Sequence, residues 1–552
     1  MDGSRVTAES AVPDSAGLNL FRADPALARL ARLYLPADLA DHLIPHLDRL
    51  GGLAGSTMDA LAGEADRNPP VLHPRTRRGE DRQSIVKHPA YRELERLAFG
   101  EFGLAALSHR GGVLGWPTPM PPAAKYLLTY LFVQAEFGLL CPVSMTDSLT
   151  RTLRRFGDET LVARYLPMLL SGDIDELAQG AMFMTEQGAG SDVGATTVRA
   201  EPAADGTWRL SGDKWFCSNP DASLAMVLAR PDPIQGGAVP GLKGVGLFLL
   251  PRERPDGTPN AYRIVRLKDK LGTRSMASGE IVLEGALAFL VGNDPRDVPG
   301  AGFRQMADMV NNSRLSNGVR AAGLMRRALT EALYVARHRR AFGQVLIEMP
   351  LMRRQLAKMT LPAEQARTMM LQTADALRRS DAGEPGAYAL LRILTPLLKF
   401  RACRDARRVT GDAMEVRGGC GYIEEWPDAR LLRDAHLGSI WEGTSNVVAL
   451  DVMRAARRDG GLDALTAHVR GLAVPGLDVA PAMDRAAALA GTAMAPGGVH
   501  LTRQAASALY HVTSVAAMAW EAARLDDPAR LAMARMVLRH RVLPRDPLAA
   551  DE

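Results

Sequence analysis

The pattern of apolar residues changes twice along the chain, and this change limits the available folds more than any other feature. Between about residues 181 and 295, apolar residues occur in short runs bounded by turn residues, which predicts β-strands. The expected strands are residues 208–210, 224–228, 246–250, 262–265 and 281–283. The stretch 231–244 is rich in proline and glycine, so we expect an exposed hairpin loop there. The sequence therefore predicts a β domain at 181–295.

Helical spacing dominates on both sides of this region. An N-terminal apolar stripe with the spacing i, i+3, i+4, i+7 and i+11 consists of Leu128, Leu131, Phe132, Ala135 and Leu139. A second stripe, on a helix expected to end near Gly343, consists of Ala322, Met325, Leu329, Ala332, Leu333 and Ala336. We predict a mostly α fold with a central β domain: an N-terminal helical domain at 1–180, a helical bundle at 296–455, and an appended helical domain at 456–552.

Length and charge set broad limits. A chain of 552 residues exceeds what a single hydrophobic core usually supports, so several domains are expected. The net charge of +5 comes mostly from arginine, because the chain contains only eight lysines. This charge neither requires nor excludes a nucleic-acid partner, and an arginine-rich composition can equally reflect the base composition of the genome.

Cysteine spacing and hydropathy indicate a location. Cys141, Cys217, Cys403 and Cys420 lack metal-ligand spacing, so we expect no metal site and a reducing cytoplasm. The most apolar stretch, 127–145, contains polar residues, and no apolar leader follows the polar start. We therefore expect neither secretion nor a membrane span.

The stretch 439–446 places Glu442 between two bulky apolar residues, Ile440 and Trp441, and a polar turn. Partial desolvation would make this carboxylate a stronger base for a weakly acidic proton. The turn from Gly443 to Asn446 supplies backbone N–H groups, and an apolar run follows that reads as a helix start, where phosphates bind well. The alternative is a helix N-cap with an acidic first turn.

Two stretches near the β domain suit a flat polar ring. Residues 182–192 combine glycines with Thr185 and Ser191, so backbone N–H groups and hydroxyls can approach a ligand closely. In residues 212–219, Phe216 and Ser218 have strand spacing and should share one face. A ring that stacks and a hydroxyl that bonds a ring nitrogen would suit an isoalloxazine, although each stretch alone also fits an ordinary turn or strand.

These stretches, in this order and on this frame, resemble the acyl-CoA dehydrogenase family of flavoproteins. Further matching stretches are 270–275 (KLGTRS), 339–343 (RRAFG) and 418–422 (GGCGY). The chain is similar in particular to the AidB-like branch, associated with the response to DNA alkylation, through 68–70 (NPP), 140–142 (LCP), 350–353 (PLMR) and the appended C-terminal domain. The resemblance implies an N-terminal helical domain, a β domain and a C-terminal four-helix bundle.

The resemblance also implies FAD and assigns site residues. Glu442 would remove the α-proton of an acyl-CoA while hydride passes to the flavin, which makes the chain an oxidoreductase. Arg339 and Phe342 match a pair that reaches the FAD of a neighbouring subunit, so we expect a dimer or tetramer, with a homotetramer preferred. The cofactor-binding residues implied are Met182, Thr185, Ser191, Phe216, Ser218, Arg339, Phe342, Ile440, Trp441, Gly443, Thr444 and Asn446.

Two departures from the family pattern bear on activity. Gln187 stands where ordinary dehydrogenases of the family carry proline. Glu415 stands where many carry glutamine near the FAD pyrophosphate, so it adds negative charge there unless Arg417 or Arg339 offsets it. Members of the AidB-like branch also have an altered acyl channel and poor turnover, so the resemblance implies a low or unknown rate and no particular acyl chain length.

The same branch binds double-stranded DNA without sequence preference, through a basic C-terminal surface. Arg530, Arg535, Arg539 and Arg541 form the expected DNA-binding residues. Acidic residues of the same domain nearly cancel them, so a solvated helix face explains the pattern equally well. Three functions remain open: a low-turnover flavoprotein of the DNA alkylation response, a metabolic acyl-CoA dehydrogenase or oxidase without a DNA role, and a redox-silent scaffold.

Overall fold

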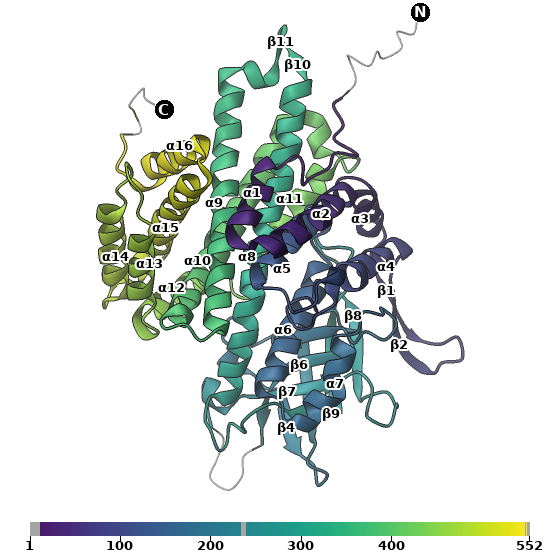
Figure 1. Cartoon of the computed structure of the whole chain (residues 1–552). Coiled ribbons are helices and arrows are strands. Elements are labelled where there is room, and N and C mark those ends of the chain that lie inside the picture. The colour runs from purple at the N-terminus through teal and green to yellow at the C-terminus, as the bar shows by residue number, and fades with distance from the viewer. Residues whose placement is uncertain (1–11, 233–238, 547, 549–552) are drawn as a thin grey trace, which may run out of the picture.

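The chain folds into a β domain at one end of a set of long helices, with a further helical unit on their flank (Figure 1). The computed structural model describes residues 12–232, 239–546 and 548. Among these residues, no helix is both long and apolar enough to cross a membrane.

The N-terminal part is mainly helical, as predicted. Its helices are α1 (Pro25–Tyr34), α2 (Ala37–Ala54), α3 (Thr57–Arg67), α4 (Pro89–Glu95), α5 (Pro122–Phe132), α6 (Leu140–Phe156) and α7 (Glu159–Leu169). The sequence reading missed a hairpin of strands β1 (Val71–Arg75) and β2 (Asp81–Val86), which projects from the molecule (Figure 1). Its residues are mostly exposed, and its apolar residues stand next to one another instead of alternating with polar ones, so no strand pattern marked it.

The predicted stripe 128–139 is interrupted. Its residues are buried, but α5 ends at Phe132 and α6 begins at Leu140, so Ala135 and Leu139 do not extend that helix. The carboxylate of Glu136 accepts hydrogen bonds from the backbone N–H groups of Gly138 (2.8 Å) and Leu139 (3.1 Å). These N–H groups are then not available for the hydrogen bonds of a continuous helix. The spacing of apolar residues in the sequence does not show this competing side-chain bond.

The β domain contains all five predicted runs. Its strands are β3 (Gly180–Phe183), β4 (Arg199–Pro202), β5 (Trp208–Ser218), β6 (Leu224–Pro231), β7 (Gly246–Pro251), β8 (Tyr262–Leu267) and β9 (Ser278–Leu290). Within the described residues they form a seven-stranded sheet in the order β3-β6-β4-β5-β9-β7, with β8 on β9 and a further β6–β7 pairing. Strands β6 and β7 are antiparallel, as a hairpin connection requires; residues 233–238 of the predicted loop lie outside the described residues.

Long helices occupy the next region. They are α8 (Ala301–His338), α9 (Pro350–Asp381), α10 (Ala387–Arg417), α11 (Pro427–Gly438) and α12 (Ser445–Arg458). Helix α8 ends at His338, five residues before the expected Gly343, because Arg339 adopts an extended backbone with φ −86° and ψ 135°. The short hairpin of β10 (Arg340–Ala341) and β11 (Gln344–Val345) follows at the end remote from the β domain (Figure 1).

The appended unit consists of α13 (Gly461–Gly471), α14 (Ala480–Met494), α15 (Thr502–Leu525) and α16 (Pro528–Val537), followed by the π-helical turn η8 (Leu538–Val542). Helix α15 packs on α9, where the amide of Gln365 donates to the hydroxyl of Ser514 at 2.6 Å. Buried polar contacts of this kind fix the unit against the long helices.

Candidate active site

Glu442 lies in the turn between α11 and α12, and its carboxylate faces helix α8. The amide nitrogen of Asn317 donates to Oε2 at 2.6 Å, and the hydroxyl of Ser313 donates to Oε1. Ser313 and Asn317 are four residues apart, so they lie on the same face of the helix. Two donors therefore hold the ionised carboxylate, where the sequence had predicted an apolar surrounding.

The backbone of this turn is fixed by two buried cations. The Nε of Arg314 donates to the carbonyl of Glu442 at 3.0 Å, and the Nζ of Lys399 donates to the carbonyl of Gly443 at 2.6 Å. Glu442 has φ +53°, a left-handed conformation that costs energy for a residue with a Cβ. These hydrogen bonds maintain that conformation and so fix the direction of the carboxylate. Burial lowers the pKa of Lys399 to about 8.

An aromatic group borders Glu442 on one side. Trp441 stacks on Phe137, with ring centroids 6.0 Å apart and an interplanar angle of 17°. The guanidinium of Arg320 lies 4.6 Å from the Trp441 centroid and 5.5 Å from that of Phe137. Ile440, expected beside the base, is 58% exposed and points to solvent instead. Only the tryptophan therefore supplies the predicted bulky apolar neighbour.

The turn leads directly into a helix, as the sequence indicated. Helix α12 begins at Ser445, with Thr444 at the N-cap position. Thr444 and Asn446 are exposed, and Asn446 is contacted at 3.5 Å by the guanidinium of Arg503. The N-terminus of α12, together with Gly443, is thus open to a ligand phosphate.

The predicted flavin contacts from the β domain lie on β3, on the segment that follows β3, and on β5. Met182 is in β3, and the backbone N–H of Trp215 in β5 donates to the carbonyl of Thr185 at 2.9 Å. Phe216 is 55% exposed, and a register shift between Lys214 and Cys217 re-aims the strand at this point. An aromatic side chain is thereby left uncovered in the middle of a strand.

Cys141, at the start of α6, is influenced by both the β domain and the long helices. Burial of its thiol raises its pKa, and the charge of Glu442 raises that pKa further. The charge of Arg320 and a hydrogen bond with Ser218 act in the opposite direction.

The glycine-rich loop after β3 is anchored by Glu186. Its carboxylate accepts from the buried Nζ of Lys214 at 2.7 Å and from the backbone N–H of Thr197 at 2.7 Å. Gln187 and Ser191 are exposed. The replacement of proline by Gln187 therefore lies at the surface of an anchored loop, and Ser191 remains open to a ligand.

Residues 270–275 connect separate parts of the structure through hydrogen bonds. Lys270 donates to the carbonyl of Met276 at 2.5 Å, the backbone N–H of Thr273 donates to Asp434 at 2.6 Å, and the hydroxyl of Ser275 donates to Glu136 at 2.8 Å. Burial, with the nearby charge of Glu136, raises the pKa of Asp434 to about 7. The stretch joins the β domain to α11 and to the turn before α6.

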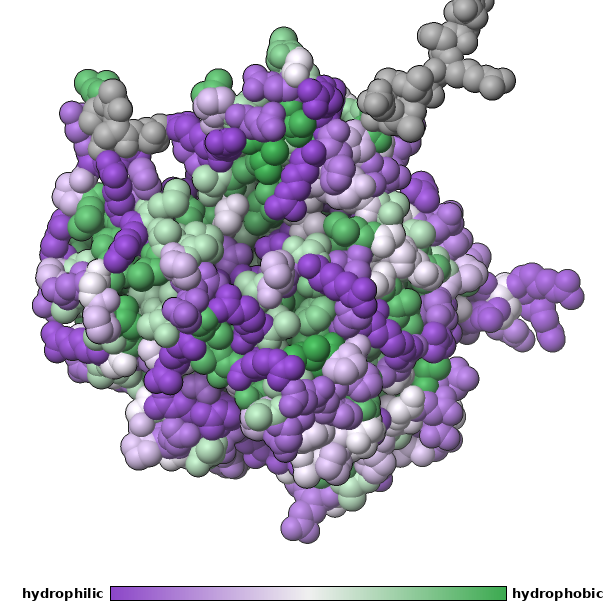
Figure 2. Space-filling view, turned by 45° about the horizontal axis from the view of Figure 1, so that its top comes forward, coloured by the Kyte–Doolittle hydropathy of each residue, from purple (hydrophilic) through white to green (hydrophobic). Residues whose placement is uncertain are grey.

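Arg339 and Phe342 lie far from Glu442 within one chain. Helix α8 carries Asn317 beside the base and ends just before Arg339, about 30 Å further along its axis at 1.5 Å per residue. Phe342 is 94% exposed and Tyr422 is 81% exposed. Figure 2 shows hydrophobic residues protruding at the top of the molecule, where Figure 1 places this hairpin. The pair therefore cannot complete the site of its own chain.

The charges near this hairpin differ from the expectation. Arg417 is 1% exposed, and its guanidinium pairs with Glu331 (2.5 Å) and Asp428 (2.6 Å), so it cannot offset Glu415. Arg339 donates to the carbonyl of Arg417 at 2.9 Å. Of the two arginines, Arg339 is exposed and can meet a phosphate.

The C-terminal arginines do not form one surface. Arg530 is 1% exposed and pairs with Glu521 (2.5 Å) and Glu364 (2.7 Å), so the prediction that it contacts DNA is wrong. Arg535 and Arg539 are exposed. Arg541 is half-buried in the η8 turn near Arg408 of α10, and burial together with that charge lowers its pKa. The spacing of arginines along the sequence did not distinguish the buried Arg530 from the exposed Arg535 and Arg539.

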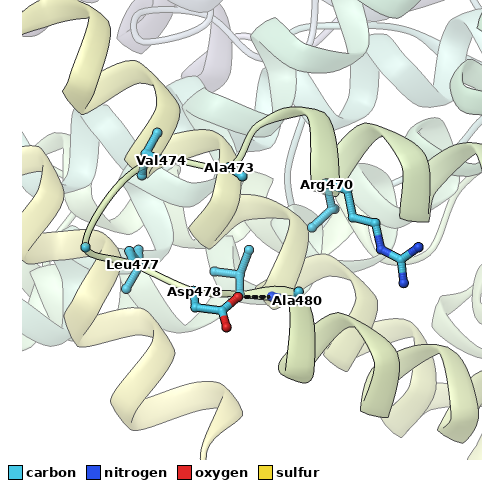
Figure 3. A pocket seen from close by; sticks show the side chains of 9 residues that line it. Arg470, Ala473, Val474, Leu477, Asp478 and Ala480 are labelled. Atoms are coloured by element: carbon cyan, nitrogen blue, oxygen red, sulfur yellow. Dashed lines mark hydrogen bonds between the residues drawn. The ribbon is translucent and has the colours of Figure 1, made fainter.

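A separate pocket of about 380 Å³ lies in the appended unit, lined by residues 469–480 (Figure 3). Apolar side chains including Val474 and Leu477 form its wall. Asp478 accepts from the backbone N–H of Ala480 at 3.0 Å, and Arg470 points away and pairs with Asp484. Both charged side chains at this pocket are therefore occupied by bonds to other protein groups. Glu442 is the better candidate for a catalytic residue.

Sequence reasoning missed Ser313, Asn317, Arg320 and Lys399 as parts of the site. A signal existed, because α8 carries polar residues at positions that are buried, including Asn312 and Ser316. Buried polar side chains without an obvious structural use often belong to a site. The pairing of α8 with a turn more than a hundred residues later could not be read from either segment.

Comparison with known proteins gives a consistent result. Family models match residues 10–176 (adaptive response protein AidB N-terminal domain), 181–286 (acyl-CoA dehydrogenase middle domain) and 300–456 (acyl-CoA dehydrogenase C-terminal domain). AidB of Escherichia coli (strain K12) is 35% identical over 459 residues, covering 80% of this chain and 79% of that protein. Acyl-CoA dehydrogenase family member 11 of Caenorhabditis elegans is 32% identical, covering 79% and 70%. The crystal structure of Caenorhabditis elegans ACDH-11 with C11-CoA superposes with a TM-score of 0.88 at 27% identity, covering 98% and 95%.

Proposed function

This chain belongs to the acyl-CoA dehydrogenase family and is an FAD-dependent oxidoreductase, and we propose that Glu442 is the base that removes the α-proton of its acyl-CoA substrate. The observation that carries this proposal is the fixed direction of the Glu442 carboxylate, which is held by Asn317 and by the bonds of Arg314 and Lys399 to the turn backbone. A positioned carboxylate beside a cofactor surface is the arrangement that α-proton abstraction needs.

The residues of the chain fit FAD. Phe216 leaves an aromatic face uncovered, and the hydroxyls of Ser218, Thr185 and Ser191 lie in the same part of the β domain. When bound, FAD supplies an acceptor for hydride. The uncovered ring offers stacking to a flat heterocycle, and the hydroxyls offer hydrogen bonds to its polar edge.

The surrounding residues give Glu442 its properties as a base. Arg314 and Lys399 fix the peptide groups on both sides of it, so the carboxylate points in one direction before substrate arrives. The proton is taken up on a carboxylate oxygen, and Asn317 and Ser313 each donate to one of these oxygens. These two hydrogen bonds fix the orientation of the carboxylate that takes up the proton. The low turnover that the family resemblance implies stays a prediction.

An anaerobic titration of the purified flavoprotein with short, branched and long acyl-CoAs tests the function. We expect the oxidised flavin absorbance to bleach with at least one class of acyl-CoA, and to stay unchanged in Glu442→Gln, which should still bind flavin. Arg524→Gln, an exposed arginine of the appended unit over Trp520, is the matched control and should bleach like the wild type. Bleaching that survives in Glu442→Gln would remove Glu442 from the mechanism.

We also infer a homo-oligomer, preferably a tetramer, in the cytoplasm. The exposed Phe342 and Tyr422 provide an apolar surface that a second copy can cover. Arg339 is exposed beside them and has the charge and shape to hold a pyrophosphate of the neighbouring FAD. The four cysteines are free thiols, which fits a reducing compartment.

A second function, sequence-independent binding of double-stranded DNA in a response to alkylation damage, is favoured by one observation. Lys358 of α9 has its pKa lowered by burial and by the cations around it, Arg354, Arg408, Arg541 and Arg545. Clustered basic side chains attract the phosphates of DNA. We call this surface the α9/α10 basic patch; it takes the place of the buried Arg530, and Arg535 and Arg539 stay predictions.

The DNA function is tested by the salt dependence of duplex binding. Neutralising Arg408 and Arg541 together with glutamine should weaken binding and reduce the slope of log affinity against log salt by about two, one for each lost phosphate contact. The control is Arg263→Gln, which removes a surface arginine paired with Glu284 in the β domain. An unchanged slope in the double variant, or equal weakening by the control, would leave the metabolic dehydrogenase without a DNA role.

A further inference from the structure

Arg320 is a buried cation beside the base for which the described residues supply no counter-ion. It is 0% exposed, and it is not in salt-bridge contact with any carboxylate of residues 12–232 or 239–546. Its one hydrogen bond runs from Nη2 to the side-chain oxygen of Asn317, at 2.5 Å. A guanidinium stays charged at any physiological pH, so burial without a carboxylate needs an explanation.

Unused hydrogen-bond donors gather at this arginine. In the part of the chain that the structure describes, Nε and Nη1 of Arg320 have no partner, and neither has the buried Nε1 of Trp441. The Arg320 guanidinium lies 4.6 Å from the Trp441 ring, so these donors are neighbours. Cation–π contact with Trp441 and Phe137 compensates part of the charge but accepts none of the hydrogen bonds.

The position of Arg320 relative to Glu442 limits what can bind. Asn317 bridges them, because its oxygen accepts from Arg320 at 2.5 Å while its nitrogen donates to Glu442 at 2.6 Å. Including the amide's own bonds, the guanidinium nitrogen and the carboxylate oxygen are at most about 8 Å apart. An acyl group whose α-carbon contacts Glu442 would reach Arg320 within a few further bonds.

We propose that Arg320, with the indole N–H of Trp441, binds an anionic group at the end of a short acyl chain, so that the preferred substrate is a dicarboxylic acyl-CoA. This inference rests on the proposed function and names its substrate class. The second carboxylate supplies both the missing counter-ion and acceptors for the unused donors. Asn317 stands between this carboxylate and Glu442 and separates the two negative charges.

The test compares acyl-CoAs that differ by one carboxylate. Calorimetric titrations of the holoprotein use glutaryl-CoA against pentanoyl-CoA and succinyl-CoA against butyryl-CoA, so that the CoA contribution is common to each pair. We expect the acidic member to bind at least about tenfold more tightly, as for a desolvated charge pair. In Arg320→Met this ratio should fall to about one, with the neutral ligand bound as in the wild type, while Arg320→Lys keeps part of the preference.

Controls separate this inference from the proposed function. The guanidinium of Arg524 lies 4.7 Å from the centroid of the Trp520 ring, a cation–π contact like that of Arg320 but in the appended unit. Arg524→Met removes this contact and should keep the full ratio of affinities. Flavin absorbance and melting temperature report whether the Arg320 variants fold. The affinity ratio of the wild type tests the inference even if the variants do not fold. If the wild type prefers the neutral ligand, this inference is wrong and the proposed function is unaffected. The same holds if Arg320→Met loses affinity equally for both ligands, or loses flavin. Failure of every acyl-CoA to bind overturns the proposed function as well.

Discussion

The side-chain amide of Asn317 donates to the carboxylate of Glu442 at 2.6 Å, across an interface between α8 and the turn that precedes α12. This contact joins two segments more than a hundred residues apart in sequence and fixes the orientation of the Glu442 carboxylate. The same amide accepts a hydrogen bond from Arg320. One residue thus couples the base to the buried cation, and its removal should affect both.

Asn317→Leu should slow proton abstraction by Glu442. The Asn317 amide fixes the orientation of the carboxylate, and a hydrogen bond to a charged group contributes about 1.5 to 3 kcal/mol, so its loss should lower the rate of acyl-CoA-driven flavin reduction by about tenfold. Single-turnover, anaerobic stopped-flow measurement of flavin bleaching checks this. Ser316→Ala, a buried substitution on the same helix, is the control and should keep the wild-type rate. An unchanged rate in Asn317→Leu would mean that Ser313 and the backbone of the turn suffice to orient the carboxylate.

The order of helical and β regions could be predicted from sequence because each has its own period of apolar residues. The stripe in α8 and the five strand runs follow directly from that period. The break at 133–139 could not be predicted, because it depends on Glu136 competing for backbone N–H groups. Glu442 was proposed as the base from local sequence, and this stays a prediction; the donors to its carboxylate come from a helix that only tertiary packing brings near.

Lys399 should make stability depend on pH. Burial lowers its pKa to about 8 from 10.5, so below pH 8 the lysine is protonated in both folded and unfolded chains and the full cost of burying the charge is present. Above pH 8 the folded protein releases the proton while the unfolded chain keeps it up to about pH 10.5, so the free energy of unfolding rises with pH. The rise should total about 3 kcal/mol.

Urea unfolding between pH 7 and 10.5, followed by circular dichroism, measures this effect. Lys270 titrates in the same range, because burial also lowers its pKa to about 8, so the comparison of wild type with Lys399→Met is required. The free energy of unfolding of the wild type minus that of Lys399→Met isolates the Lys399 contribution and should rise with pH between about 8 and 10.5. A difference that is constant with pH would show that Lys399 is not titrating in the folded state.

Arg530→Met should weaken the docking of the appended unit and leave DNA binding unchanged. The substitution leaves Glu521 and Glu364 buried without their shared cation, which costs about 3 to 5 kcal/mol when a buried pair is broken. Thermal unfolding and limited proteolysis at the α9 and α15 contact check the first result, and duplex binding checks the second. Arg485→Met, which replaces an exposed arginine of the same unit, is the comparison and should melt like the wild type. Lost DNA affinity at unchanged melting temperature would reinstate Arg530 as a DNA contact.

Arg339 should act in the site of a neighbouring chain, because α8 places it about 30 Å from the Glu442 of its own chain. Arg339→Gln should therefore lower FAD content while the fold and Glu442 remain intact. A hybrid oligomer distinguishes the two arrangements: one chain carries Arg339→Gln, the other carries Glu442→Gln, and two affinity tags isolate the mixture. If Arg339 acts across the interface, one site in each pair combines an intact Glu442 with an intact Arg339, and half of the wild-type flavin bleaching returns. If it acts within its own chain, every site lacks one of the two residues and the hybrid stays inactive. Phe342→Asp, which places a charge on the exposed aromatic position, should abolish the rescue by preventing association, as gel filtration would show.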